Sequence, residues 1–192
     1  MVFLRREGEE GGRRLVGNSV FLRHPELRDF SAWARVRGDS RAFLEPWEPI
    51  WPEDELTLGA YRYKLRRYAQ DIRDAKSFPF FVFREDDGAL VGGVTLSQVR
   101  RGAAQTGTLG YWVGQAYQGS GYTTEATQAV VRFAFVELGL HRVEAACQPD
   151  NASSRRVLAK AGFTEEGYAQ AYLKIAGKWR DHVLHAIVNP AD

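Results

Sequence analysis

The stretch QAYQGSGYTTEA, residues 115–126, is the part of the sequence whose residue types best suit the binding of an anion. Gly119 and Gly121 allow the backbone to come close to a ligand, and a helix-like stretch starts directly after them. The unpaired N–H groups in the first turn of a helix stabilise negative charge. These residues therefore predict a loop that holds phosphate, and a pyrophosphate would fit it.

Two known nucleotide-binding motifs fit this loop poorly. A Walker loop needs a lysine after its last glycine, where this sequence has Tyr122. A dinucleotide fingerprint needs a third glycine where Thr124 stands, and it normally opens the first strand–helix–strand unit of a fold. Glu144 lies about twenty residues further on and superficially suits a ribose-binding acid, but it falls within a predicted strand. Anion binding by loop amides is the remaining interpretation.

The elements around the loop predict a mixed α/β, or α+β, fold. Period-two alternation and turn residues indicate strands, and apolar residues spaced three and four apart indicate helices. Three prolines make residues 43–55 an irregular loop. The predicted strands are residues 19–23, 79–85, 90–99, 108–114, 141–147, 166–175 and 178–188, and the predicted helices are residues 25–37, 58–72, 123–138 and 153–161.

The order of these elements predicts a central, twisted, mostly antiparallel sheet of about six to seven strands, flanked by about four helices. Strands 108–114 and 141–147 are joined through helix 123–138, and a right-handed crossover leaves such strands parallel. Ligands of open sheets bind beyond the carboxyl ends of strands, and the glycine loop lies at such an end. We expect a single domain over residues 1–192, with residues 1–17 as an N-terminal arm or hairpin.

The composition is that of an ordinary globular chain. Of the 192 residues, 44% are hydrophobic and 26% charged, and a net charge of +2 gives no strong attraction to DNA or a membrane. Cys147 is the only cysteine, which excludes an intrachain disulfide and a cysteine-based zinc site. His182 and His185 are three apart on a predicted strand and face opposite sides, so we expect no metal. Neither a signal peptide nor a membrane-spanning segment is evident, which predicts a cytoplasmic protein.

Several motifs taken together resemble those of the GNAT acetyltransferases. QGSGYT is similar to the family's pyrophosphate loop, Gln/Arg-x-x-Gly-x-Gly/Ala, with Gln118 and Gly121 in place and Thr123 instead of the final small residue. NASSRRVLAKAGF resembles the family's Asn-containing loop, the helix after it and the Gly-Phe ending. FLEPWEP, LGYW, HRVEA and EGYAQAYLKIAGKWRDHVL resemble the branch that acetylates the N-terminal alanine of ribosomal proteins. The resemblance covers nearly the whole chain from about Ser19 onward.

The resemblance implies a GNAT fold with acetyl-CoA as the cofactor, held in a wedge between two splayed parallel strands. These strands would be residues 108–114 and 141–147. The backbone of Tyr111, Trp112 and Val113 would face the pantetheine and the acetyl carbonyl, where an amide could stabilise the oxyanion. The residues implied to hold the pyrophosphate are Gln118, Gly119, Ser120, Gly121, Tyr122 and Thr123.

Ser154 is the candidate acid that would protonate the departing thiolate. Many GNAT enzymes use a tyrosine seven positions after the asparagine, and this sequence has Leu158 there. Ser154 lies three positions after Asn151 and matches a serine ascribed to the ribosomal-protein branch, while Asn151 would hold ligand or water. Both residues would also contact the coenzyme. Ser154 could instead satisfy backbone N–H groups in the first turn of its helix, and the sequence leaves both roles open.

Glu48 is the candidate to bind the acceptor's ammonium group or to take its proton, directly or through water. It lies in the rigid loop 43–55, which could face the wedge. Neighbouring carboxylates would suit a positively charged acceptor, although those nearest the next helix also favour its N-terminus. Trp47 and Tyr172 are expected as pocket walls that contact the substrate.

These features favour an N-acetyltransferase whose preferred acceptor is the α-amine of a protein that begins with Ala or Ser, first of all a ribosomal protein. A small-molecule acetyltransferase that acts on a polyamine, amino acid or antibiotic is the second hypothesis. The third is an acyl-CoA-binding or ribosome-associated module with little catalysis, which the missing tyrosine keeps open. The basic face of helix 58–72 could contact ribosomal RNA transiently, although a solvated face is the simpler interpretation. Both a monomer and a homodimer remain open.

Overall fold

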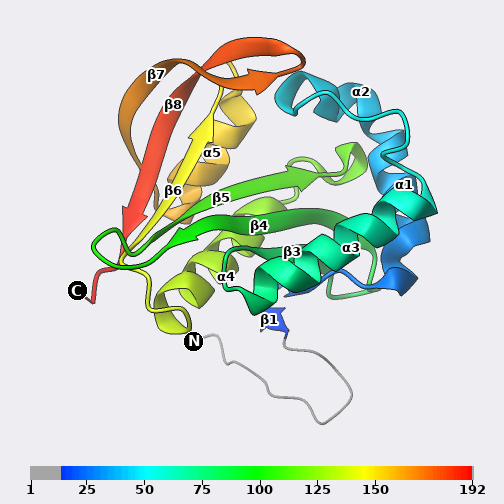
Figure 1. The fold of residues 1–192 in the computed structure, drawn as a ribbon, viewed down its shortest axis with the longest axis horizontal. Coiled ribbons are helices and arrows are strands. Elements are labelled where there is room, and N and C mark those ends of the chain that lie inside the picture. The colour runs from blue at the N-terminus through cyan, green and yellow to red at the C-terminus, as the bar shows by residue number, and fades with distance from the viewer. Residues whose placement is uncertain (1–13, 192) are drawn as a thin grey trace.

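The computed structural model describes residues 14–191, which form one sheet with helices on both faces (Figure 1). The predicted arm falls mostly outside these residues, and only its last few positions are described. In chain order the elements are β1 (Leu15–Val16), β2 (Val20–Arg23), η1 (Leu27–Asp29), α1 (Phe30–Asp39), α2 (Arg41–Leu44), η2 (Glu45–Trp47), α3 (Leu58–Arg73), β3 (Phe78–Arg84), β4 (Leu90–Arg100), β5 (Thr106–Val113), η3 (Gln115–Tyr117), α4 (Tyr122–Val136), β6 (Arg142–Cys147), α5 (Ala152–Ala161), β7 (Thr164–Ile175) and β8 (Lys178–Val188).

The predicted sheet topology is confirmed. The strands lie in the order β1-β2-β3-β4-β5-β6-β8-β7. Within the described residues β5 and β6 form the one parallel pair, and every other neighbouring pair is antiparallel. The eighth strand is β1, whose two residues are too few to give an alternating pattern in the sequence.

One predicted loop is partly helical. Residues 43–55 were expected to be irregular because of their prolines, but α2 and η2 continue through Trp47. Pro46 lies in the first turn of η2, where its missing N–H would have no intrahelical partner in any case, so it breaks nothing there. The rest of this segment, up to Thr57 at the N-cap of α3, is irregular as predicted.

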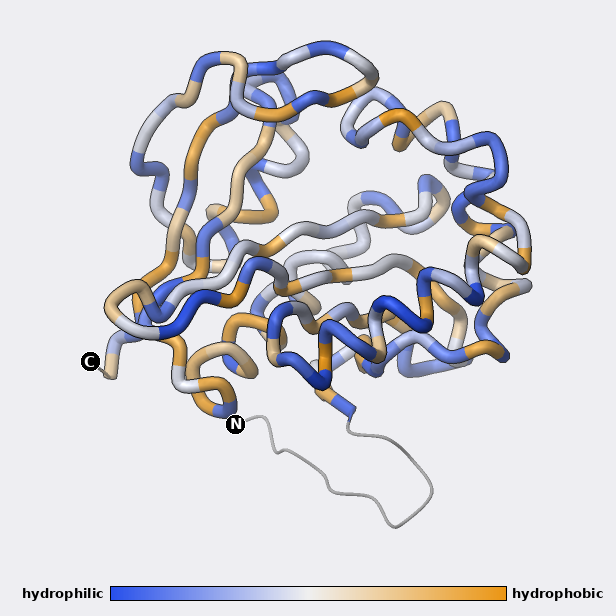
Figure 2. The backbone as a smooth tube through the Cα atoms, in the orientation of Figure 1, coloured by the Kyte–Doolittle hydropathy of each residue, from blue (hydrophilic) through white to orange (hydrophobic). Residues whose placement is uncertain are grey.

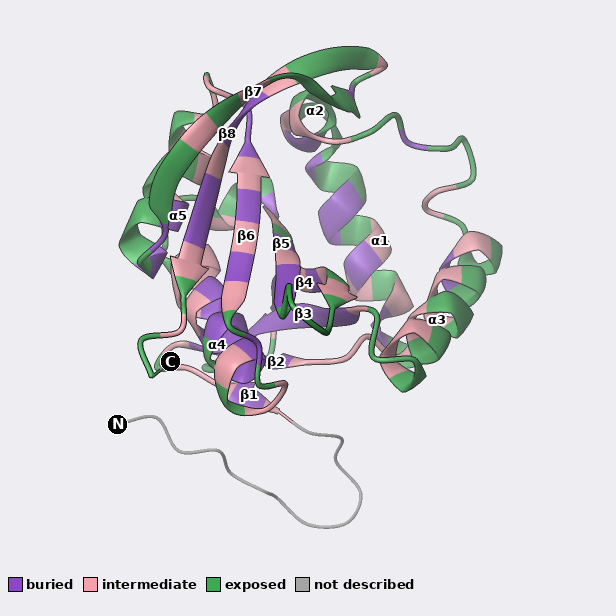
Figure 3. Ribbon diagram, turned by 60° about the vertical axis from the view of Figure 1, so that its left-hand side comes forward, coloured by how far each residue is buried: buried purple, intermediate pink, exposed green. Residues whose placement is uncertain are grey.

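Two hydrophobic clusters cover the two faces of the sheet. Helices α4 and α5 pack on one face, where Val130 and Leu158 are completely buried. Helices α1 and α3 cover the other face (Figure 3), where Trp33 and Tyr61 belong to one buried cluster with Phe81 of β3. Strongly hydrophilic residues recur along α3 between its hydrophobic ones (Figure 2). Because side chains alternate between the two faces of a strand, each residue of β5 faces either the side covered by α4 and α5 or the side covered by α1 and α3.

The parallel pair is short and opens at its carboxyl end. β5 and β6 are paired only through Thr106–Arg142, Gly107–Val143 and Thr108–Glu144. Beyond these pairs β5 remains bonded to β4, and β6 remains bonded to β8 as far as Cys147. The two strands therefore diverge while each keeps a neighbour, and an opening through the sheet results.

Strand β7 forms one edge of the sheet, and most of its residues are exposed. Its register with β8 shifts between Ala169 and Leu173, and Ala171 has a left-handed backbone with φ of 46°. The turn between β7 and β8 reaches over to the segment after η2 (Figure 1), where the N–H of Ala176 donates to the carbonyl oxygen of Glu48 at 2.9 Å.

Candidate active site

A cleft of about 810 Å³ lies where β5 and β6 part. Most of the predicted site residues line it, and they come from β5, the glycine loop, the start of α5 and the segment around η2. Ser120, Tyr122 and Tyr172 lie outside its walls. The predicted residues that line the cleft are Trp47, Glu48, Tyr111, Trp112, Val113, Gln118, Gly119, Gly121, Thr123, Asn151 and Ser154.

The glycine loop has the backbone that its sequence predicts. Gly119 and Gly121 have φ values of 80° and 84°, which side chains with a Cβ rarely adopt. Gly121 is the N-cap of α4, and no side chain caps this helix. The N–H groups of the first turn of α4 therefore remain available to an anion in the cleft.

Two cations that the sequence analysis did not single out lie at the same end of the cleft. Arg156 and Lys160 are four residues apart on α5, so they share one face of that helix, and both line the cleft. Their positive charges suit the phosphate groups of a ligand held by the glycine loop. The i, i+4 spacing after the asparagine motif was the available signal in the sequence.

The hydroxyl of Ser154 faces Tyr111 of β5. The two side-chain oxygens are 2.7 Å apart, and the Tyr111 hydroxyl also lies 3.2 Å from the Ser154 carbonyl oxygen. The helix cap is made by Asn151, whose side-chain oxygen accepts from the N–H of Ser154 at 3.0 Å. Burial raises the pKa of Tyr111 well above its usual value, so the phenol stays neutral. The side-chain hydroxyl of Ser154 therefore does not cap the helix, and it lies within hydrogen-bond distance of the neutral Tyr111 hydroxyl.

Glu48 is held rigidly at the opposite end of the cleft. Its two carboxylate oxygens each accept from Arg37 at 2.7 Å, and one of them also accepts from the indole N–H of Trp51 at 2.7 Å. The Arg37 guanidinium lies 4.1 Å from the ring of Trp51 and 5.0 Å from that of Trp112. Sequence reasoning missed Arg37, because a cation near the end of an amphipathic helix normally lies in solvent.

The two groups of side chains lie on opposite sides of the sheet. Tyr111 packs with the cluster beneath α4 and α5, whereas its neighbour Trp112 packs with the cluster beneath α1 and α3. The Tyr111–Ser154 pair thus belongs to the α5 side and Glu48 to the α1 side. The cleft touches both sides because β5 and β6 are unpaired at this level.

Cys147 also lines the cleft at the end of β6, with 5% of its surface exposed. Burial raises the pKa of its thiol, and a hydrogen bond with the Ser154 side chain opposes this only in part. The thiol is therefore protonated at neutral pH, which disfavours a covalent acetyl-cysteine route.

We expect iodoacetamide to modify Cys147 more slowly in the native protein than in the urea-unfolded chain at pH 8, because the raised pKa lowers the thiolate fraction. The native rate should rise as pH increases above the ordinary thiol pKa of about 8.5. Mass spectrometry of the modified protein measures both rates. Equal rates for the native and unfolded chains at pH 8 would contradict a raised pKa.

Within residues 14–191, no three His, Cys, Asp or Glu side chains gather in a way that could hold a metal ion. His182 lines the cleft and His185 does not, as their opposite facing on β8 predicts. No helix in the described part of the chain is both long and apolar enough to cross a membrane.

Residues 19–164 match the family described as Acetyltransferase (GNAT) domain. A Bacillus subtilis (strain 168) protein named Probable N-acetyltransferase YjcK is 39% identical over 178 residues, which cover 93% of this chain and 98% of that protein. The ribosomal protein uS5-alanine N-acetyltransferase of Escherichia coli (strain K12) is 35% identical over 177 residues, 92% of this chain and 91% of that enzyme. The structure of Mycobacterium smegmatis RimJ in complex with CoA-disulfide has a TM-score of 0.84 at 36% identity and covers 90% of this chain and 83% of that one.

The glycine loop, the opening between the parallel strands and these matches lead to one conclusion: the chain belongs to the GNAT acetyltransferase family, whose members transfer an acetyl group from acetyl-CoA to an amine.

Proposed function

We propose that the protein acetylates the α-amine of a protein that begins with Ala or Ser, and that a ribosomal protein is its substrate. The observation that carries this proposal is the cleft that crosses the sheet, with a hydroxyl pair on one side and the Glu48 carboxylate on the other. The relative from Escherichia coli, named for acetylating ribosomal protein uS5, supports the substrate class. A ribosomal substrate would place the reaction in the cytoplasm.

Acetyl-CoA would enter from the α4 and α5 side. The first turn of α4, with Arg156 and Lys160, would hold the phosphates. The pantetheine would lie along the part of β5 beyond Thr108, which has no ladder partner in β6. A related structure that contains CoA-disulfide supports this use of the cleft.

The transfer would proceed by direct attack in a ternary complex. The neutral amine attacks the acetyl carbonyl, and a backbone N–H among Tyr111, Trp112 and Val113 stabilises the oxyanion. The C–S bond then breaks, and the Ser154 hydroxyl gives its proton to the thiolate. Asn151 fixes the backbone of Ser154 through its cap. Glu48 attracts the positively charged acceptor to the other side, and Trp47 forms part of the wall there.

Exposed apolar side chains near the acceptor end favour a protein substrate. Leu173 lines the cleft and is 42% exposed, while Ile50 is 71% exposed. Ile50 packs beside Gly177 at the turn between β7 and β8. Large apolar residues that gather around a site are typical of a surface that a protein partner covers. Tyr172, on the same hairpin, would contact the acceptor at the rim of the cleft.

A small amine is the second candidate acceptor. Its support is the size of the cleft, since about 810 Å³ falls within the range of small-molecule sites. The two candidates differ in whether the apolar rim takes part in binding.

The first test is to incubate the protein with acetyl-CoA and a panel of amines and to read the products by mass spectrometry. The panel holds peptides that begin with Ala, Ser, Met and Gly, together with polyamines and aminoglycosides. We expect a gain of one acetyl group on the Ala and Ser peptides alone. A gain only on a small amine would support the second candidate. Bound coenzyme without any product would support a module with little catalysis.

Replacing Ser154 by Ala should lower kcat by about 10²-fold or more, because the thiolate then leaves without an acid. Tyr111→Phe should lower kcat by slowing the same proton transfer, because it removes the hydroxyl that is the hydrogen-bond partner of Ser154 while it changes the side-chain volume only slightly. The double variant should then lose little beyond Ser154→Ala, as groups that act together are not additive. Steady-state kinetics on an Ala peptide measure all three variants. Unchanged turnover in Ser154→Ala would remove Ser154 from the mechanism.

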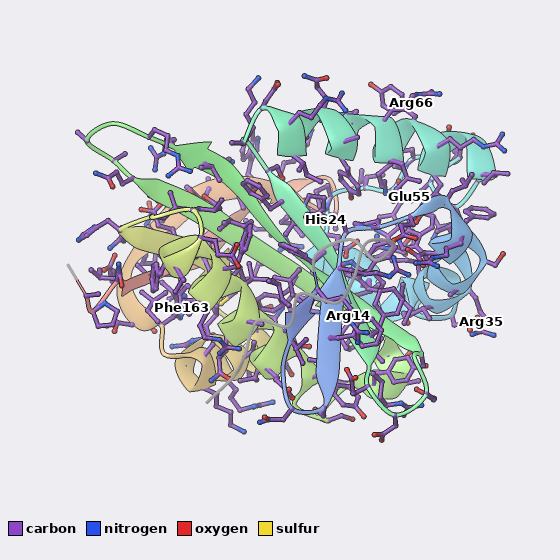
Figure 4. All side chains as sticks on the ribbon, turned by 90° about the horizontal axis from the view of Figure 1, so that it is seen from below. Arg14, His24, Arg35, Glu55, Arg66 and Phe163 are labelled. Atoms are coloured by element: carbon purple, nitrogen blue, oxygen red, sulfur yellow. The ribbon has the colours of Figure 1, made fainter. Side chains whose placement is uncertain are left out.

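We also propose a transient contact between α3 and ribosomal RNA. Helix α3 contains five basic residues and one acidic residue, Asp71, so its net charge is +4, although the whole chain carries only +2. Arg62, Arg66 and Arg67 are exposed, and no carboxylate in the described residues pairs with them. Arg66 lies on the outer side of α3 in Figure 4. Unpaired arginines along one exposed helix suit a phosphate backbone.

The double variant Arg62→Glu/Arg66→Glu should weaken binding to purified ribosomes. It should also reduce the slope of the logarithm of the binding constant against the logarithm of the salt concentration by about one to two, which corresponds to the loss of one to two phosphate contacts. Acetylation of a free Ala peptide should not change, because α3 contributes no residue to the cleft. Binding at several salt concentrations measures the effect. Arg35→Glu/Arg132→Glu is the control, since it changes the net charge equally through exposed arginines of α1 and α4. Equal weakening by both double variants would contradict a specific role of α3.

A further inference from the structure

We propose that His182 of β8 is the base that takes the proton of the attacking amine. This inference rests on the proposed function, because it assigns a role within acetyl transfer. The sequence analysis considered His182 only as a metal ligand and excluded it as such.

His182 faces the acceptor side of the sheet. Its neighbour Val183 pairs with Cys147, whose side chain packs in the cluster beneath α4 and α5. Adjacent strand residues point to opposite sides, so His182 faces away from that cluster. It lines the cleft together with Trp47 and Glu48, and only 3% of it is exposed. The imidazole is therefore a wall of the acceptor end of the cleft.

The surroundings of His182 fix which ring nitrogen can accept a proton. Nδ1 lies 3.0 Å from the carbonyl oxygen of Arg180. A carbonyl oxygen only accepts hydrogen bonds, so in the neutral ring Nδ1 carries the hydrogen and Nε2 keeps its lone pair. Among residues 14–191, no group forms a hydrogen bond with Nε2. The other ring contact is edge-to-face packing with Tyr172, at 5.7 Å between centroids.

Glu48 is less suited to the same task. Each of its oxygens already accepts from the Arg37 guanidinium, and Trp51 adds a third hydrogen bond. Protonation of this carboxylate would remove the negative charge that strengthens these three hydrogen bonds. The two residues therefore have different roles: Glu48 supplies a fixed negative charge that attracts the acceptor, and His182 supplies the lone pair that accepts the proton.

The proton balance closes with these groups. As the C–N bond forms, the amine nitrogen gives one proton to Nε2 of His182, and the imidazolium that results shares the cleft with the Glu48 carboxylate. As the C–S bond breaks, the CoA thiolate takes the proton of Ser154. After the products leave, the imidazolium returns its proton through solvent, and Ser154 regains one. The net reaction converts a neutral amine and acetyl-CoA into an amide and CoA thiol.

A histidine base also agrees with an α-amine as the acceptor. An α-ammonium group has an ordinary pKa of about 7.7–8.0, whereas a lysine ammonium has one of about 10.4. Near neutral pH an α-amine is thus partly deprotonated before it binds, and a histidine suffices for the remaining proton, whereas an aliphatic side-chain amine would need a stronger base.

The decisive experiment compares His182→Gln with His185→Gln on an Ala peptide. His185 is a matched control: it lies on the same strand, is equally buried and bonds the carbonyl oxygen of Val183, but it does not line the cleft. We expect His182→Gln to lose about 10²- to 10⁴-fold in kcat, with an unchanged KM for acetyl-CoA. His185→Gln should keep its kcat. Melting temperatures of both variants report any loss of folding.

The pH profile separates a base from a packing residue. Wild-type kcat should fall on the acidic side as the base becomes protonated, and His182→Gln should lack this limb. Among the other titratable groups, Asp181 is adjacent to His182 in the chain, Tyr172 packs against the ring, and Glu48 and Cys147 line the same cleft. Asp181 already accepts from the Tyr168 hydroxyl at 2.5 Å and from the N–H of Ala171 at 2.8 Å.

His182→Ala gives an independent readout, because imidazole added to the buffer should restore part of its kcat and should not affect His185→Ala. If the wild type is active and His182→Gln keeps both the wild-type kcat and its fall at acidic pH, this inference is overturned and the proposed function stays intact. A wild-type protein that acetylates no amine would overturn both.

Discussion

The separation of β5 and β6 after three paired residues is the constraint on which the site depends. Each strand keeps a partner on its outer side, so the sheet remains intact while its middle opens. The inner backbone edges beyond Thr108 and Glu144 are left with polar groups that need partners. A ligand with its own amides, such as pantetheine, can supply them. The same opening lets side chains from both faces of the sheet reach one reacting centre.

The two sides of that opening differ in electrostatic character. On the α5 side the polar groups at the centre are the neutral hydroxyls of Tyr111 and Ser154. On the α1 side Arg37 is 7% exposed, lies against two tryptophans and is paired with Glu48. Removing one partner of such a buried pair leaves an uncompensated charge. This pair therefore fixes the position of η2 and the acceptor wall as well as the local charge.

Much of the fold could be predicted from the sequence, because strand alternation, helical spacing and turn residues act locally. The parallel pair followed from the strand–helix–strand order, and the left-handed loop followed from Gly119 and Gly121. The site was predicted less completely. The partnership of Arg37 with Glu48 and that of Tyr111 with Ser154 join residues 11 and 43 positions apart. Contacts at such separations depend on how the elements pack, and one sequence carries no local signal for them.

The interruption in β7 bears on how this molecule avoids pairing with its own copies. An exposed edge strand of twelve residues offers unpaired backbone groups to another chain, and such edges promote aggregation. The register shift after Ala169 and the left-handed Ala171 break this edge into two short pieces. A second strand could add to one piece but could not continue across the bulge. The hairpin that borders the acceptor end thus carries its own protection against forming an intermolecular sheet.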